Sequence, residues 1–217
     1  MHVLIINGSP RVQKYSNTDK IIDSFAKGLS SEGVTSTKYA VSDRNSWNSI
    51  RKAYEENTQI IIALPLFVEC VPGLLLEFLE TLPEKNKDTQ TAFILQGGFA
   101  EGCQFRYGEN FLKKLPDYLG CTYGGCLVKG DNFSIRIMER KQRERITGPY
   151  EQMGVLFAQK LSFDNEEARV FTGSEYLSLP LRLILGFEFK TLAKTMFKAA
   201  AKNWGCKEPL DARPYAG

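Results

Sequence analysis

The chain begins with MHVLIINGSPR over residues 1–11 and continues with the triplet SNT at residues 16–18. The apolar run ends in a turn of glycine, serine and proline. An arginine follows, and then two hydroxyls and an amide where a helix should begin. A helix N-terminus after a strand and a polar loop can hold a phosphate, because its first N–H groups lack intrahelical partners and its dipole favours negative charge. This stretch therefore predicts an anion site at the carboxyl end of a first strand.

Strand-like and helix-like segments alternate after this stretch. Apolar runs predict further strands at residues 35–41, 60–64, 91–96 and 122–128. Apolar residues at helical spacing predict helices after residue 16, at 46–56, after Pro72, at 105–119 and at 151–161. A strand and a helix recur about every 30 residues, which is typical of βαβ units. We therefore expect an α/β fold with a doubly wound, five-stranded parallel sheet and helices on both faces, and we assign it the order 2-1-3-4-5, which is one of the common orders of such sheets.

Residues 165–217 exceed what such a core needs. We expect one domain over residues 1–164, and a C-terminal helical extension over residues 165–217 packed on the core or on a dimer partner. Part of the extension has an apolar helical face: Phe189, Leu192, Ala193, Met196, Phe197, Ala200 and Trp204. Lysines recur on another face: Lys190, Lys194, Lys198 and Lys202. This pattern indicates either a basic helix that contacts a membrane surface or a partner, or a packing helix with a solvated face, and we favour the second interpretation.

Composition limits the classes of protein to consider. Hydrophobic residues make up 43% and charged residues 24% of the 217 residues, as in ordinary globular proteins, and the net charge is +3. No secretion signal and no membrane-spanning stretch is recognisable, so we expect a cytoplasmic protein. The five cysteines form no CxxC pair and His2 is the only histidine, so we predict free thiols and no metal site. Cys121 and Cys126 lie an odd number of residues apart in a probable strand, which predicts opposite faces.

Three loops follow the carboxyl ends of predicted strands, at residues 9–18, 65–71 and 96–102. In an open α/β sheet these ends meet at the switch point between strands one and three, where ligands bind. The first loop suits a phosphate. The second offers Pro65, Leu66 and Phe67 to a flat ring, and the third offers glycine-rich backbone and Gln96 to the ring edge. Together the loops predict a pocket for a phosphate joined to a flat heteroaromatic system.

These residues carry a resemblance to a known family. GSPR at residues 8–11 with SNT at 16–18, and PLF at 65–67 with Pro72 and FLE at 78–80, resembles the NADPH-dependent FMN reductase family of flavodoxin-like proteins. The resemblance covers roughly residues 1–160. It departs from the family at residues 12–15, and at residues 130–133, which are less glycine-rich than is usual. No CxxCxxC cluster motif is present.

The resemblance implies a flavodoxin-like fold and an FMN site. It places the FMN phosphate against Ser9, Arg11, Ser16, Asn17 and Thr18. It sets the isoalloxazine against Pro65, Leu66, Phe67 and Val68. It assigns the other side or edge of the ring to Gln96, Gly97, Gly98 and Phe99. The flavin carries the chemistry in this family, so no side-chain acid or base is expected to be catalytic.

The implied function is an NAD(P)H oxidoreductase that passes hydride from NADPH or NADH to flavin N5. The electrons then go to a small-molecule acceptor, which is a quinone, azo, nitro or flavin compound, and relatives are often homodimers. Two alternatives stay open. One is a flavodoxin-like electron carrier that nicotinamide does not reduce directly, against which the basic charge counts. The other is a flavin-free interaction protein with this fold.

A basic segment follows the fifth strand. Its cations are Arg136, Arg140, Lys141, Arg143 and Arg145, with Glu139 and Glu144 between them. The segment either receives the additional phosphate of NADPH or forms an ordinary solvated helix, and we favour the solvated helix. It lacks the interleaved aromatic residues that nucleic-acid binding would require, so no nucleic-acid partner is predicted.

Overall fold

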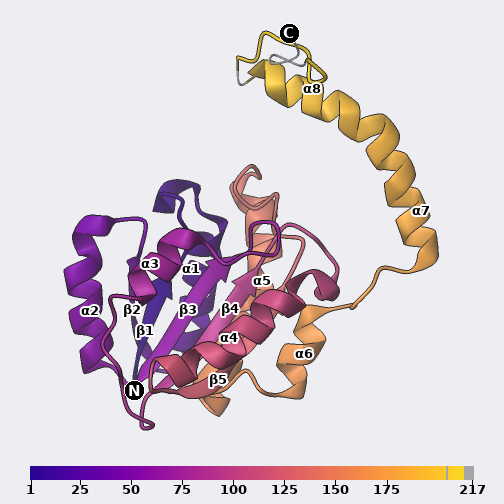
Figure 1. Cartoon of the computed structure of the whole chain (residues 1–217). Coiled ribbons are helices and arrows are strands. Elements are labelled where there is room, and N and C mark those ends of the chain that lie inside the picture. Colours follow the sequence, from indigo (N-terminus) through magenta and orange to yellow (C-terminus); the bar gives the residue numbers. More distant parts are fainter. Residues whose placement is uncertain (204, 213–217) are drawn as a thin grey trace. The chain divides into compact units, whose positions relative to one another are not determined.

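A computed structural model describes residues 1–203 and 205–212, and its core is one five-stranded sheet (Figure 1). The strands are β1 (His2–Asn7), β2 (Thr35–Ala40), β3 (Gln59–Pro65), β4 (Gln90–Gln96) and β5 (Thr122–Lys129). They are all parallel and lie in the order β2-β1-β3-β4-β5. This confirms the predicted sheet and its order.

Six helices surround this sheet among the first 175 residues. They are α1 (Asn17–Ser31), α2 (Trp47–Glu56), α3 (Gly73–Leu79), α4 (Arg106–Tyr118), α5 (Arg140–Lys160) and α6 (Glu166–Thr172). Local sequence sets several of their ends. The Ser16 hydroxyl accepts the Asp19 N–H at the start of α1, and the Asn165 side chain accepts the Ala168 N–H at the start of α6.

Helix α5 is longer than expected. It begins at Arg140 rather than at Glu151, so it includes most of the basic segment, and it runs through Pro149. Proline in a helix interior removes one backbone hydrogen bond, so a helix that begins after Pro149, as expected from the sequence, would be locally more favourable. On the N-terminal side of Pro149, Thr147 is buried and Ile146 packs against the core, and this packing outweighs the local cost.

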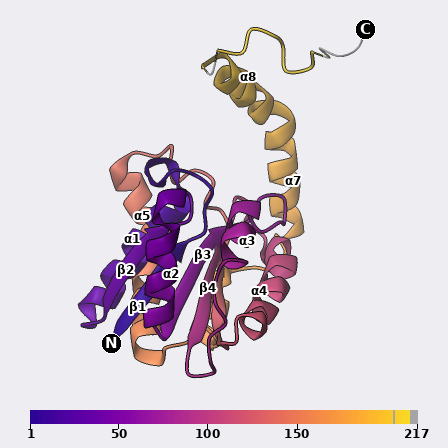
Figure 2. The same ribbon diagram turned by 60° about the vertical axis from the view of Figure 1, so that its left-hand side comes forward.

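The two faces of the sheet bury separate cores, and the layers can be followed in Figure 2. Strand β3 contributes to both because successive side chains point to opposite faces. Ile60, Ile62 and Leu64 pack with α2, α3 and α4, whereas Ile61 and Ala63 pack with α1 and α5. The continuous apolar run of β3 is therefore that of a strand covered on both sides.

Helices α1 and α5 approach each other unusually closely, and two glycines make this approach feasible. A Cβ atom added to Gly28 would lie 1.9 Å from the Glu151 carbonyl oxygen, and one added to Gly154 would lie 2.1 Å from the Phe25 carbonyl oxygen. Neither position has room for a side chain. The contact fixes α1, whose N-terminus faces the carboxyl edge of the sheet, against the long helix α5.

Strand β5 contains an irregularity that changes the face of its second half. Thr91 pairs with Tyr123 but Phe93 pairs with Cys126, so Gly124 and Gly125 together stand opposite one residue of β4. Gly125 has φ 88°, a conformation that glycine adopts readily. Cys126 therefore packs against the same core as Cys121, and the expectation of opposite faces was wrong.

The chain divides into two compact units, residues 1–175 and 176–217, which we call the N-terminal unit and the C-terminal unit. The N-terminal unit includes α6, which the expected boundary at residue 164 left in the extension. The C-terminal unit contains α7 (Leu179–Glu188), a π turn (Phe189–Ala193) and α8 (Lys194–Asn203), while Trp204 lies outside the described residues. What this unit packs on stays a prediction. None of the helices described has the length and apolar character needed to cross a membrane.

Candidate functional site

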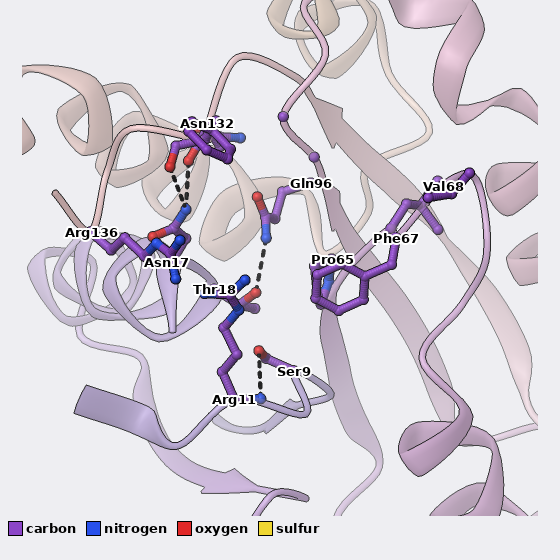
Figure 3. A pocket seen from close by; sticks show the side chains of 14 residues that line it. Ser9, Arg11, Asn17, Thr18, Pro65, Phe67, Val68, Gln96, Asn132 and Arg136 are labelled. Atoms are coloured by element: carbon purple, nitrogen blue, oxygen red, sulfur yellow. Dashed lines mark hydrogen bonds between the residues drawn. The ribbon is translucent and has the colours of Figure 1, made fainter. Parts of the chain in front are cut away.

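A pocket of about 250 Å³ opens at the carboxyl edge of the sheet, where β1 and β3 lie side by side (Figure 3). Loops from four strands build it. Its lining residues are Ser9, Arg11, Asn17, Thr18, Pro65, Leu66, Phe67, Val68, Gln96, Gly97, Gly98, Asn132, Phe133 and Arg136. All the residues predicted for a cofactor are among them except Ser16 and Phe99.

Asn7 shapes the loop after β1. Its fully buried side chain accepts the Ser9 N–H at 3.0 Å and donates to a carboxylate oxygen of Asp19 at 3.3 Å. The Ser9 hydroxyl in turn accepts the Arg11 N–H at 3.3 Å. A residue at the end of β1 thereby ties the loop to the first turn of α1, and both Ser9 and Arg11 line the pocket as predicted.

Ser16 has a different task from the one the resemblance implies. It is fully buried, and its hydroxyl accepts the Asp19 N–H at 3.2 Å instead of lining the pocket. The N–H groups of Asn17 and Thr18, which begin α1, have no carbonyl one turn earlier to accept them. Capping by Ser16 leaves these two groups at the pocket end of the helix.

Residues 12–15, where the sequence departs from the family, form a short exposed 3-10 turn. Lys20 holds this turn, because its ammonium group donates to the Lys14 carbonyl at 2.9 Å and to the Ser16 carbonyl at 3.3 Å. Partial burial is the main cause that lowers the pKa of Lys20. The loop that carries Arg11 is therefore braced at both ends, by Asn7 and by Lys20.

Asn17 links α1 to the loop after β5. Its amide nitrogen donates to the Asn132 carbonyl at 2.6 Å and to the Phe133 carbonyl at 3.3 Å, as Figure 3 shows. These two acceptors fix the orientation of the amide, so its oxygen faces away from them. That oxygen is buried and has no hydrogen-bond donor among the described residues. An unsatisfied buried acceptor costs about 1–3 kcal/mol, which a hydroxyl or N–H donor from a ligand would relieve.

Gln96 and Thr18 form the floor of the pocket. The Gln96 amide nitrogen donates to the Thr18 hydroxyl at 3.1 Å, and both side chains are buried. The end of β4 is thus joined to the start of α1 across the switch point. Gln96 lines the pocket as predicted, but the partner of its amide nitrogen is a neighbouring side chain.

The loop after β3 forms an apolar wall. Phe67 and Cys70 exchange two backbone hydrogen bonds of 3.0 and 3.1 Å around Val68 and Glu69. Both central residues have positive φ, 50° at Val68 and 63° at Glu69, which is the pattern of a type I′ turn that normally uses asparagine and glycine. A β-branched residue is strained in this region, by roughly 1–2 kcal/mol. The turn presents Val68 to solvent with 88% of its surface exposed.

The loop after β5 supplies the opposite wall, and the resemblance did not assign it to the site. The Asn132 N–H donates to the Gly97 carbonyl at 3.0 Å, and its side chain donates to the Tyr150 hydroxyl at 2.8 Å. Phe133 follows, and its Cβ atom lies 3.5 Å from where a Cβ on Gly98 would be. This is an ordinary van der Waals distance, so Phe133 packs beside residue 98 without requiring glycine there. The signal in the sequence was that residues 130–133 are less glycine-rich than in the family.

Phe99, which was predicted to contact the ring, does not line the pocket. It is 64% exposed, and its carbonyl oxygen accepts the Asp131 N–H at 3.0 Å. The same carbonyl would lie 1.9 Å from a Cβ atom on Gly130. The two loops thus pack backbone to backbone at this point, and the Phe99 ring projects away from the pocket.

The charges around the pocket are of one sign. Arg11 and Arg136 line it, and no residue in its lining carries a carboxylate. The nearby Asp19 is already paired with Lys38 at 2.9 Å. Together with the N-terminus of α1, this arrangement favours an anion at one end of the pocket. Within the described ranges, no group of three or more histidine, cysteine or acidic side chains is placed to hold a metal ion.

Comparison with solved structures identifies proteins that share this fold. An FMN-dependent NADH-azoreductase from Bacillus anthracis, solved in complex with FMN, matches with a TM-score of 0.54 and 13% identity, over 73% of this chain and all of that one. The chain has a flavodoxin-like fold. A putative quinone reductase from Klebsiella pneumoniae (TM-score 0.53, 10% identity, 70% of this chain and 83% of that one) matches similarly. The Trp repressor binding protein from Bacillus subtilis also matches, with a TM-score of 0.52 and 15% identity, over 73% of this chain and 99% of that one.

At these identities the similarity shows the fold alone. No protein-family model matches the sequence, and a search of curated proteins found no match either. The activity of this flavodoxin-like protein therefore has to be argued from its own pocket.

The residues present fit FMN. The first N–H groups of α1, the hydroxyls of Ser9 and Thr18, and two guanidinium groups suit a phosphate. The wall of Pro65, Leu66 and Phe67 and the facing wall of Gly97, Gly98 and Phe133 suit a flat ring. The buried oxygen of Asn17, which has no donor among the described residues, suits a hydroxyl group of the ligand.

Proposed function

We propose that this protein is an FMN-dependent NAD(P)H oxidoreductase. The observation that carries the proposal is the pocket itself, in which a cationic, hydroxyl-lined end and an apolar slot meet at the switch point of a flavodoxin-like sheet. When bound, FMN would accept hydride from NADPH or NADH and pass electrons to a quinone, azo, nitro or flavin acceptor. The names of the matching solved structures, an azoreductase and a putative quinone reductase, support this class of reaction.

The phosphate end binds by charge and by preorganised donors. Arg11 and Arg136 would neutralise the phosphate, while Ser9, Thr18 and the first N–H groups of α1 would donate to its oxygens. Asn7 and Ser16 act through these residues, because they hold the loop and cap the helix without lining the pocket. Donors held in place in the free protein lose little entropy when the ligand binds.

The slot end orients the ring and leaves one approach open. Pro65, Leu66 and Phe67 would lie along the ring, with the backbone of Gly97 and Gly98 near its other edge. Phe67 is 40% exposed and Phe133 is 63% exposed at the mouth of the pocket, so both rings offer apolar surface to a nicotinamide or an acceptor. No acid or base from the chain is required, since hydride and electrons move through the cofactor.

The experiment has two stages. FMN is titrated into the purified protein, and quenching of flavin fluorescence reports binding. NADPH or NADH is then added to the loaded protein in a stopped-flow instrument, and fast bleaching of the flavin absorbance supports the proposal. Bound FMN that neither nucleotide bleaches would identify an electron carrier instead. Absence of FMN binding would identify a flavin-free protein with this fold. The homodimer also stays a prediction, to be measured by sedimentation.

A further inference from the structure

The C-terminal unit presents a long apolar and basic helix that the proposed function does not use. Helices α7 and α8, joined by the π turn, run from Leu179 to Asn203 (Figure 1). Eight of its large apolar side chains are 41% to 70% exposed: Leu179, Leu181, Leu183, Ile184, Phe187, Leu192, Met196 and Phe197. Single exposed apolar residues are ordinary, but a continuous set of this size marks an interaction surface.

The apolar surface is broad where it begins. Leu181, Leu183, Ile184 and Phe187 are spread around α7, which is wider than the narrow seam of a coiled coil. A shallow groove runs onward along Leu183, Ile184, Phe187, Glu188, Thr191 and Leu192. A helix that is apolar over most of its circumference exposes apolar side chains to water in any orientation on a protein surface. Such a helix is more stable where an apolar environment surrounds it.

The charges on this helix are nearly all positive. Residues 179–203 carry five cations, Arg182, Lys190, Lys194, Lys198 and Lys202, against the single carboxylate of Glu188, which is a net charge of +4. Lys190, Lys194, Lys198 and Lys202 recur at every fourth residue, which places them along one side of the helix. The four lysines form a row beside Leu192, Met196 and Phe197.

The helices of the N-terminal unit show what an ordinary solvated face looks like in this chain. They carry charge pairs of opposite sign one turn apart, such as Lys52 with Glu56 and Arg140 with Glu144. None of the four lysines of α7–α8 pairs with a carboxylate among the described residues. A single-signed cationic row beside bulky apolar residues complements an anionic surface with an apolar interior.

We propose that the helix over residues 179–203 binds the surface of an anionic lipid bilayer. It would lie in the interface with Leu183, Ile184 and Phe187 among the acyl chains. Lys190, Lys194, Lys198 and Lys202 would then lie at the level of the headgroups. The charges at Arg182, Glu188 and Lys190 interrupt the apolar run, which favours a helix parallel to the membrane plane. This proposal is independent of the proposed function.

The test is co-sedimentation of the full chain with vesicles. Vesicles of phosphatidylcholine that contain phosphatidylglycerol should bind the protein at low ionic strength, and vesicles of phosphatidylcholine alone should bind it much less. Added salt should weaken the binding, because lysines attract anionic lipid over about one Debye length. No binding to the anionic vesicles at low ionic strength would overturn the proposal.

Variants locate the binding surface. Replacement of Lys190, Lys194, Lys198 and Lys202 by glutamine should weaken binding to anionic vesicles by about 1,000-fold, since each lysine near the surface contributes about 1 kcal/mol. The matched control replaces four exposed lysines of the N-terminal unit, Lys27, Lys52, Lys113 and Lys114, by glutamine. The control changes the net charge equally and should leave binding nearly intact. Equal losses in both variants would assign binding to overall charge and overturn the proposal.

The apolar face is tested separately. Leu183→Ser with Phe187→Ser should abolish vesicle binding while all the lysines remain, and circular dichroism should show that the helical content is kept. Undiminished binding of this variant to anionic vesicles would overturn the proposal that the helix inserts its apolar face into the bilayer. Self-association without vesicle binding, detected by sedimentation velocity, would assign the face to a second copy of the chain and would also overturn the proposal.

Discussion

The two ends of the pocket are held in place in different ways. The phosphate end is braced by buried hydrogen bonds, in which Asn7, Ser16 and Lys20 each hold a neighbouring segment. The slot end depends on a tight turn with positive φ at Val68 and Glu69 and on exposed aromatic side chains. The phosphate end is thus preorganised by polar groups that are hydrogen-bonded to one another. The slot end has a strained backbone turn and exposed apolar side chains. An anion needs fixed donors, whereas a flat ring needs shape and an open approach.

The largest expected effect comes from the helix contact that positions the braced end. Gly154→Ala should lower the free energy of unfolding by about 3 kcal/mol or more, because its Cβ would lie 2.1 Å from the Phe25 carbonyl oxygen. Urea denaturation measures the change. Gly73→Ala, at the exposed start of α3, is the matched control: apart from its chain neighbours, nothing lies within 4 Å of its added Cβ, and it should be neutral or stabilising. Similar losses in the two variants would contradict this account of the α1–α5 contact.

The next effect tests the buried bracing directly. Asn7→Ala should cost about 2 kcal/mol of stability, since it leaves the Ser9 N–H without its acceptor and removes a donor to Asp19. FMN affinity should fall as well, because the loop loses its fixed shape. Thermal denaturation and the fluorescence titration report the two effects. An Asn7→Ala protein of normal stability would show that the loop is held by other contacts.

Arg11 should affect binding without affecting stability. Arg11→Ala should weaken FMN binding about tenfold, as expected for the loss of one charge-assisted hydrogen bond, and should leave the melting temperature unchanged because Arg11 is exposed. Arg145→Ala is the control, since Arg145 is equally exposed but does not line the pocket. Unchanged FMN affinity in Arg11→Ala would remove this residue from the phosphate end.

Ser16 should behave in the opposite manner. Ser16→Ala removes the cap of α1 and should lower stability by about 1 kcal/mol. Its effect on FMN affinity should be smaller than that of Arg11→Ala, since its hydroxyl does not line the pocket. A larger loss of FMN affinity than in Arg11→Ala would restore Ser16 to the phosphate contacts that the resemblance implied.

The smallest effect concerns the strained end. Val68→Gly should raise the free energy of unfolding by about 0.5–1 kcal/mol, because glycine adopts positive φ without steric cost and this gain exceeds its additional entropy when unfolded. Comparison of urea midpoints with the wild type measures it. A destabilised Val68→Gly protein would mean that contacts of the valine side chain outweigh the backbone strain.

Much of the fold could be predicted because the strand and the helix of each βαβ unit each have a recognisable spacing of apolar residues in the sequence. Apolar runs such as residues 60–64 identify strands buried on both faces, and most loops of the site follow strand ends that are visible in the sequence. The start of α5 could not be predicted, since Pro149 is locally unfavourable and only the packing of Ile146 and Thr147 ahead of it explains the continuous helix. The prediction that Cys126 lies on the opposite face from Cys121 was wrong for a similar reason. The bulge at Gly124 and Gly125 depends on pairing with β4, which the sequence of β5 does not show.

The sequence by itself determined the five strands, the position of the pocket and most of its lining, because these follow from strand periodicity and from where strands end. The strand order came from the known doubly wound sheets that share this pattern. Only the tertiary structure decided what each polar group does there. Of the two residues that the sequence offered as the cap of α1, Ser16 is the cap, whereas Asn17 holds the loop after β5, which brings Asn132 and Phe133 into the site. Hydrogen-bond partners far apart in sequence are chosen by the packing of whole elements. No spacing rule along the chain contains that information.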